Sequence, residues 1–189
     1  MRLDRHRAPA RLLGILVVLL LVGLGIALVA SWSTPRPGGD GPAGPGSALE
    51  LAAVERVVDG DTLVVRLDGA VERVRLIGLD APEQARPSDG IAAECWASEA
   101  TEAHATLVDG SEVRLERDVS DRDRFGRLLR HAWVRVGGEW GLLSERLVAL
   151  GAAEARSYPP DVSRDDDLDA AERRARGAGA GLWGACDRG

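Results

Sequence analysis

Three short motifs in the chain hold acidic and arginine side chains that could act together in one site. The motifs are Val-Asp-Gly-Asp-Thr at 58–62, Val-Arg-Leu-Ile-Gly-Leu-Asp-Ala-Pro-Glu at 74–83 and Asp-Arg-Asp-Arg-Phe-Gly-Arg at 121–127. The candidate side chains in them are Asp61, Asp80, Glu83, Arg75 and Arg127. Carboxylates that have no histidine or cysteine beside them suit a hard cation, Ca²⁺ or Mg²⁺, rather than zinc.

The chemistry that these residue types favour is the hydrolysis of a phosphodiester. A bound metal ion polarises a phosphoryl oxygen and lowers the pKa of a water. Arginines neutralise the negative charge that grows on the phosphoryl group in the transition state. A carboxylate can position the attacking water or take its proton.

Each motif taken alone has a simpler explanation. Asp-Gly is the commonest hairpin signal, so the first motif is also an ordinary turn between strands. Arg75 could be a solvated strand residue, and Arg127 could pair with Asp123 at the surface. The conjunction of the motifs, in this order and spacing, is what favours a catalytic site.

Apolar periodicity and turn residues predict the elements that must position these side chains. Strands are expected at 51–57, 62–67, 71–76, 113–117 and 128–136. Helices are expected at 92–108, 140–150 and 165–176. Five short strands with one inserted helix and two that follow predict an α+β fold, built on a small, partly open barrel of the OB type.

The predicted strand order brings the acidic residues together. Asp61 begins the strand at 62–67, whereas Asp80 and Glu83 follow the strand at 71–76. If these two strands are neighbours, all three carboxylates converge at one end of the sheet.

The order of these motifs resembles the staphylococcal nuclease (thermonuclease) family, over roughly residues 50–185. The resemblance implies a five-stranded OB-type barrel with about three helices. It also implies the hydrolysis of DNA, RNA or both, with one Ca²⁺ as cofactor.

Residue by residue, the resemblance assigns the metal ligands first. Asp61 and Asp80 would be the side-chain ligands of calcium, and the backbone carbonyl of Ala81 would be a further ligand. Family members often have threonine at the position of Ala81, but a carbonyl ligand does not depend on the side chain.

The resemblance then assigns the catalytic groups. Glu83 would position the water or act as general base, and Arg75 and Arg127 would bind the phosphate and stabilise the transition state. All five catalytic side chains match, which separates this chain from inactive relatives that serve as interaction modules.

Three departures from the family bear on affinity and substrate preference. Phe125 stands where the family has a tyrosine. A tyrosine-rich stretch of the family is reduced here to Tyr158, which is the only tyrosine in the chain. The first 48 residues hold five arginines and two acidic residues, so the rest of the chain carries a net charge of −9. An acidic domain disfavours tight, non-specific binding of duplex nucleic acid.

The first part of the chain is expected to direct the rest across a membrane. We expect a basic cytoplasmic segment at 1–11, a transmembrane or signal helix at 12–30, a Pro/Gly/Ser linker at 31–48 and the nuclease-like domain at 49–189. The arginines before the apolar run keep the N-terminus in the cytoplasm. The domain is therefore expected to be extracytoplasmic and monomeric, anchored to the cell membrane or secreted if the helix is cleaved.

The cysteines, histidines and tryptophans receive structural roles. Cys95 and Cys186 are expected to form a disulfide, with two free buried cysteines as the alternative. We expect His104 on a helix surface, and tryptophans that pack in the core rather than stack on bases.

Two other functions compete with nuclease activity. One is a non-catalytic OB-type module that binds nucleic acid or protein, which the acidic charge favours. The other is a lipid phosphodiesterase, which only the membrane helix favours.

Overall fold

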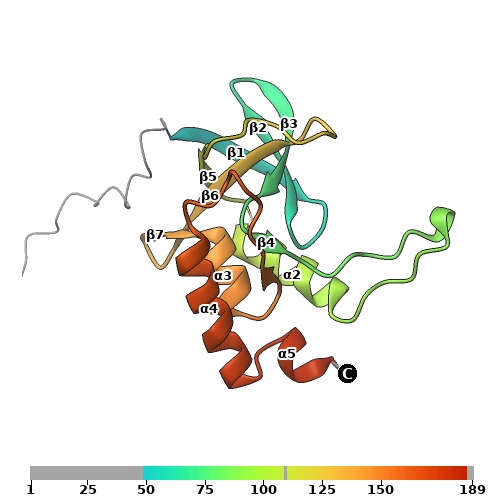
Figure 1. Ribbon diagram of the computed structural model, residues 1–189. Helices are drawn as coiled ribbons and strands as arrows, with labels where there is room; N and C mark the ends of the chain where they lie inside the picture. Colours follow the sequence, from blue (N-terminus) through green and yellow to red (C-terminus); the bar gives the residue numbers. More distant parts are fainter. Residues whose placement is uncertain (1–48, 109, 187–189) are drawn as a thin grey trace, which may run out of the picture. The chain divides into compact units, whose positions relative to one another are not determined.

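The computed structural model describes residues 49–108 and 110–186 (Figure 1). The predictions for 1–11, 12–30 and 31–48 lie outside these residues. Within the described part of the chain, no helix is long and apolar enough to cross a membrane.

Five strands form a barrel that closes on itself. They are β1 (Glu50–Val57), β2 (Thr62–Leu67), β3 (Ala70–Leu76), β5 (Glu112–Glu116) and β6 (Leu128–Val136). The first three form the expected antiparallel meander, and β5 pairs with both β1 and β6. A parallel pairing between β3 and β6, in which Val74 lies opposite Leu128, closes the ring. The sheet that was expected to be partly open is therefore a closed barrel, with five strands as predicted.

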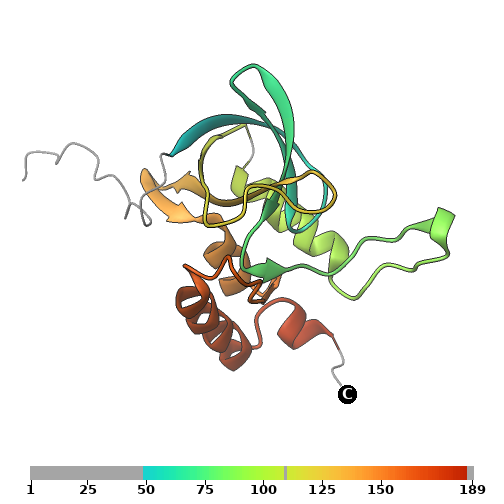
Figure 2. The same cartoon turned by 45° about the horizontal axis from the view of Figure 1, so that its top comes forward.

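The main helices occur in the expected order, one between β3 and β5 and two after β6. They are α2 (Ala97–Val108), α3 (Leu143–Ala149) and α4 (Asp165–Ala178), with a short α5 (Leu182–Ala185) and a 3-10 turn, η1 (Pro87–Asp89). In Figure 1, α3 and α4 lie side by side below the barrel, and Figure 2 shows the same arrangement turned by 45°.

Two helix predictions were wrong at their first residues. The helix expected at 92–108 begins at Ala97, because Trp96 has a positive φ of 73° that a right-handed helix cannot contain. The first residues of the helix expected at 140–150 instead belong to a strand, β7 (Glu139–Leu142), which pairs with β6. The helix itself begins at Leu143. Gly137 and Gly138 both have positive φ and make the tight turn of that hairpin.

Two short strands were not predicted. β4 (Leu79–Asp80) and β8 (Glu154–Ala155) pair in an antiparallel two-stranded sheet. A strand of two residues has no periodicity to detect, so sequence patterns cannot find it. This pairing matters because it fixes the backbone at Asp80.

Aliphatic side chains fill the barrel and the space between it and the helices. The largest fully buried ones are Leu63, Leu76, Leu79, Leu115, Leu143, Leu147, Leu168 and Leu182. His104 is also fully buried, so its predicted place on the helix surface was wrong. Its Nδ1 lies 3.0 Å from the carbonyl oxygen of Asp59, and burial lowers its pKa.

The predicted disulfide between Cys95 and Cys186 is present. It joins the residue just before Trp96 to the residue that follows α5, across a separation of 91 residues. The segment that enters α2 is thus fixed covalently to the C-terminal part of the domain.

Candidate active site

The turn between β1 and β2 places Asp61 in a buried position. Asp61 is 7% exposed, and its N–H donates to the carboxylate of Asp59 at 3.1 Å. A Cβ at Gly60 would lie 2.5 Å from the Cβ of Ala81. Glycine is therefore required for the turn to approach the segment that carries Ala81.

Arg75 joins the two aspartates that were predicted to converge. Its NH1 lies 2.6 Å from Oδ2 of Asp61, and its NH2 lies 3.2 Å from Oδ1 of Asp80. The register between β2 and β3 places Arg75 directly opposite Thr62, the residue after Asp61. A second guanidinium, from Arg156, binds Oδ2 of Asp80 at 3.0 Å.

The buried carboxylate of Asp61 is short of positive charge. Its pKa is raised to about 7, mainly by burial; Arg75 opposes this increase and the nearby charge of Asp59 adds to it. Asp61 also accepts hydrogen bonds from the hydroxyl of Thr62 at 2.9 Å and the N–H of Ala81 at 3.4 Å. A further cation at this carboxylate would favour its ionised form.

The carboxylates of Asp61 and Asp80 are the oxygen donors at this position that could hold a cation. Among the described residues, no group of three histidine, cysteine or acidic side chains is close enough to hold a metal. A hard cation held by Asp61 and Asp80 would need further oxygen ligands from backbone carbonyls or waters. Ala81 contacts Asp61 here through its N–H, so the role expected for its carbonyl stays a prediction.

The loop between β5 and β6 holds Arg127 through Asp123. Oδ1 of Asp123 accepts the N–H groups of Phe125 and Arg127, and its Oδ2 lies 2.6 Å from Nε of Arg127. Burial opposes the ionisation of Asp123, but these hydrogen bonds outweigh it, so the pKa of Asp123 is lowered. The pairing of Arg127 with Asp123 leaves NH1 of Arg127 free to donate to the hydroxyl of Thr62 at 3.3 Å.

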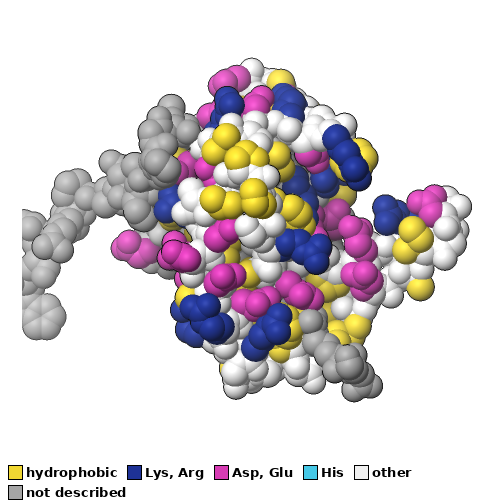
Figure 3. Space-filling model, viewed as in Figure 1, with side chains coloured by type: hydrophobic (Ala, Val, Ile, Leu, Met, Phe, Trp, Pro, Cys, Tyr) yellow, Lys and Arg dark blue, Asp and Glu magenta, His cyan; other side chains and the backbone are white. Residues whose placement is uncertain are grey.

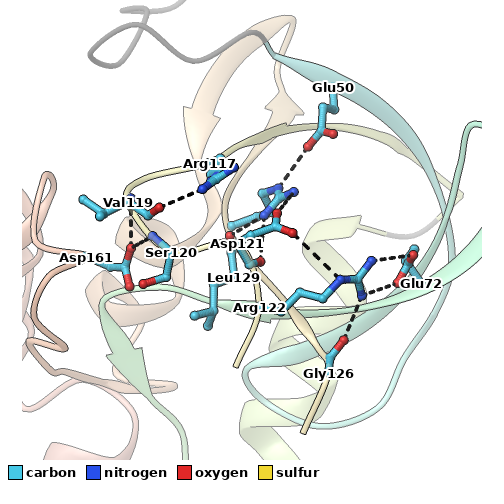
Figure 4. Close-up of polar contacts among 11 residues, drawn as sticks. Glu50, Glu72, Arg117, Val119, Ser120, Asp121, Arg122, Gly126, Leu129 and Asp161 are labelled. Atoms are coloured by element: carbon cyan, nitrogen blue, oxygen red, sulfur yellow. Dashed lines mark hydrogen bonds and ion pairs between the residues drawn. The ribbon is translucent and has the colours of Figure 1, made fainter. Parts of the chain in front are cut away.

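Polar contacts at both ends fix the loop that carries Arg127 (Figure 4). Arg122 binds both carboxylate oxygens of Glu72 at 2.9 Å and also donates to the carbonyl of Gly126. The carboxylate of Asp161 accepts the N–H groups of residues 119–120 at 3.0 and 2.7 Å. The position of Arg127 is therefore set by the barrel on one side and by the segment before α4 on the other.

Asp61, Arg75, Glu83 and Arg127 line one cleft of about 600 Å³. Phe125 lies at the same cleft and is 70% exposed. Together with the contacts of Asp80 and Ala81, this cleft brings every predicted site residue into one region.

A second cavity shares two arginines with the first cleft. It has a volume of about 380 Å³ and is lined by Arg75, Arg127, Tyr158 and the prolines at 159–160. The face of the molecule in Figure 3 mixes arginine and acidic side chains rather than presenting a continuous basic surface. Arginine side chains on this face are therefore interspersed with acidic ones.

Sequence reasoning missed several residues that hold the site. Arg156 lies just after β8, in a segment without a motif, so nothing in the sequence connected it with Asp80. Asp123 and Thr62 stand inside the motifs, but their roles depend on side-chain contacts that spacing does not reveal.

Comparison with known proteins gives consistent matches. The family model described as staphylococcal nuclease homologue matches residues 73–185, which include Arg75 and Glu83 but begin after Asp61. The thermonuclease of Staphylococcus intermedius is 36% identical over 135 residues, 71% of this chain and 76% of that protein. The thermonuclease of Staphylococcus hyicus is 32% identical over 130 residues, 69% of this chain and 73% of that protein. The SPbeta prophage-derived endonuclease YokF of Bacillus subtilis is 33% identical over 132 residues, 69% of this chain and 43% of that protein.

Proposed function

Because the chain belongs to the staphylococcal nuclease family, we propose that it is a calcium-dependent, extracytoplasmic endonuclease. Its substrates are DNA, RNA or both, and it hydrolyses their phosphodiester bonds with low sequence specificity. The observation that carries the proposal is the contact of Arg75 with both Asp61 and Asp80, in a cleft that also holds Glu83 and Arg127.

Each side chain has a distinct task in this reaction. Arg75 and Arg127 bind the phosphate and stabilise the charge that develops on it in the transition state. Glu83 orients the attacking water and takes its proton as the new bond to phosphorus forms. Asp61, Asp80 and the carbonyl of Ala81 would hold Ca²⁺, which when bound supplies the charge that polarises a phosphoryl oxygen.

Low sequence specificity follows from the groups that face the cleft. Its charged lining suits the phosphate, which is the same at every position of a nucleic acid. Binding of long duplexes is expected to be weak and sensitive to salt, because the domain is acidic outside the site.

The proposed location rests on the sequence before the domain and on the disulfide. The apolar run at 12–30 follows four arginines, which favours export of everything after it. The bond between Cys95 and Cys186 supports the same location, because disulfides persist in oxidising compartments. We propose a monomer that is anchored to the membrane, or secreted if the helix is removed.

An assay of nuclease activity with controlled calcium tests the proposal. The full chain, purified in detergent, is incubated with plasmid DNA, single-stranded DNA and RNA, in millimolar Ca²⁺ or in chelator. We expect cleavage only with Ca²⁺, and loss of cleavage in the Asp61→Asn and Glu83→Gln variants. Cleavage that persists in chelator would contradict calcium dependence.

The same variants separate the enzyme from a non-catalytic binding module. Glu83→Gln should lower turnover to a small residual rate while leaving affinity for a nucleic acid nearly unchanged, because it removes the proton acceptor without changing the shape of the cleft. A wild-type protein that binds but never cleaves would favour the binding module instead.

A further inference from the structure

Glu83 lies at the base of an arm that projects from the barrel. In Figures 1 and 2, the segment between β4 and α2 extends away from the rest of the domain. The two sides of the arm meet at Arg86 and Ile91, whose backbones exchange hydrogen bonds of 2.9 and 3.1 Å. Such a segment needs an attachment at its base if Glu83 is to keep one position.

Glu94 provides that attachment through two reciprocal hydrogen bonds. Oε2 of Glu94 accepts the backbone N–H of Glu83 at 2.9 Å. The backbone N–H of Glu94 donates to the carbonyl oxygen of Glu83, also at 2.9 Å. Both main-chain polar groups of Glu83 are therefore held by one residue.

The position of Glu94 is itself fixed from two directions. The next residue, Cys95, is bonded to Cys186, and the carbonyl of Glu94 accepts the N–H of Ala97 at 3.2 Å, where α2 begins. On the other side of the base, the amide of Gln84 donates to the carbonyl of Ala97 at 2.8 Å. The base of the arm is thus bound to the first turn of α2.

The backbone of Glu83 matters because its side chain has little else to orient it. Glu83 is an exposed residue that lines the cleft. Within the described residues, its carboxylate forms no hydrogen bond or ion pair. Its direction is therefore set by the backbone that Glu94 holds, and small displacements of a catalytic group can reduce a rate strongly.

We propose that Glu94 is a positioning residue, which holds the backbone of Glu83 so that its carboxylate faces the attacking water. The proposal rests on the role of Glu83 in the proposed function. Glu94 does not touch the substrate, and it acts only through Glu83.

A double-mutant cycle tests this role in the full chain. Glu94→Ala should lower kcat between about 10- and 100-fold, with KM changed less than about twofold. In the Glu83→Gln background the same change should have no further effect on kcat, because no carboxylate remains to be positioned. An equal loss in both backgrounds would overturn the proposal, as would an unchanged kcat in Glu94→Ala alone.

Two conservative variants and a control distinguish positioning from folding. Glu94→Gln should retain most of the activity, because its amide oxygen still accepts the N–H of Glu83. Glu94→Asp should lose activity although it keeps the charge, because its side chain is shorter; the opposite order would overturn the proposal. Glu102→Ala, an exposed change on α2, should leave kcat unchanged.

Thermal unfolding completes the test. Glu94→Ala should lose kcat while its Tm stays within a few degrees of the wild type. A Tm lowered by more than that, with kcat equal to the wild type well below the Tm, would show a structural role only and overturn the proposal. Full activity of Glu83→Gln would instead overturn the role of Glu83 in the proposed function. Failure of the proposed function can thus be told apart from failure of the positioning role of Glu94.

Discussion

Arg75 lies 2.6 Å from the carboxylate of Asp61, in a position where little water reaches either group. The same guanidinium reaches Asp80, so one cation holds an acidic side chain from the turn before β2 and another from β4. Arg75 therefore divides its donors between two acids, and the charge of the buried Asp61 is only partly compensated. This arrangement is the basis for the first two predictions.

Replacing Arg75 by lysine should reduce kcat by about 100-fold or more. Lysine keeps the charge, but its single ammonium cannot reach both carboxylates with the planar geometry of a guanidinium. Loss of one donor that stabilises a transition-state oxyanion costs about 10²–10³ in kcat. Steady-state kinetics on a short DNA substrate measure the effect. Arg66→Lys, an exposed change on β2, is the matched control and should leave kcat unchanged.

Asp61→Asn should stabilise the metal-free protein at pH 8. The pKa of Asp61 is raised from 3.8 to about 7 in the fold, so between these values the folded state binds the proton and the unfolded state does not. The contribution of Asp61 to the free energy of unfolding is therefore fully present below about pH 4, and it is lost as the pH rises through about 7. The asparagine variant avoids this cost, which is on the order of a few kcal/mol.

Urea unfolding in chelator at pH 4 and pH 8 measures the difference between Asp61→Asn and the wild type. The variant should gain stability at pH 8 but not at pH 4. Added Ca²⁺ should stabilise the wild type and leave the variant unchanged. A variant that is less stable than the wild type at pH 8 in chelator would contradict the account of Asp61.

Asp123→Ala should lower kcat roughly 10- to 100-fold through Arg127. Asp123 holds both the backbone and the Nε of Arg127, so its removal frees the guanidinium to leave the hydroxyl of Thr62. Asp169→Ala on α4 is an exposed acidic control. If kcat is retained while the stability falls, Asp123 serves the loop and not the reaction.

Phe125→Ala should weaken the binding of single-stranded substrates. The ring is 70% exposed at the cleft and lies against Arg124 and Arg127, so one face can receive a base. Stacking of a base on an aromatic ring contributes about 1–3 kcal/mol, so its loss should raise KM by roughly 5- to 150-fold. Phe125→Tyr should behave like the wild type. An equal KM for Phe125→Ala and the wild type would exclude stacking at this residue.

Removing the disulfide by a Cys95→Ser and Cys186→Ser double change should destabilise the domain. The bond closes a loop of about 90 residues, worth roughly 4–5 kcal/mol in the chain-entropy model. Urea unfolding under oxidising conditions measures the difference. The wild type in reductant should match the double variant, and a mismatch would indicate that the serines themselves perturb the fold.

Local sequence signals predicted the barrel well where they were complete. The strands β2 and β6 have the expected bounds, because apolar runs end at clear turns. The start of α2 was missed because a positive φ at Trp96 depends on tertiary constraints that no pattern records. The hairpin of β7 was missed because its four residues read as the first turn of a longer helix.

The residues of the site also divide into those that sequence patterns predicted and those that they missed. Asp61 and Arg75 were found because they stand at strand ends in recognisable motifs, and strand register then brings them together. Arg156 and Glu94 were missed because their contacts come from loops that only the folded chain brings together. Patterns find side chains that belong to regular elements more readily than those that support them from irregular segments.

The span of the disulfide has a consequence for the order in which the fold is completed. Cys95 cannot meet Cys186 until all the intervening residues have been synthesised and have reached surroundings that oxidise thiols. Under the proposed export, the covalent link at the base of the arm is therefore among the last features of the domain to form. Until then, hydrogen bonds alone would join Glu83 to Glu94.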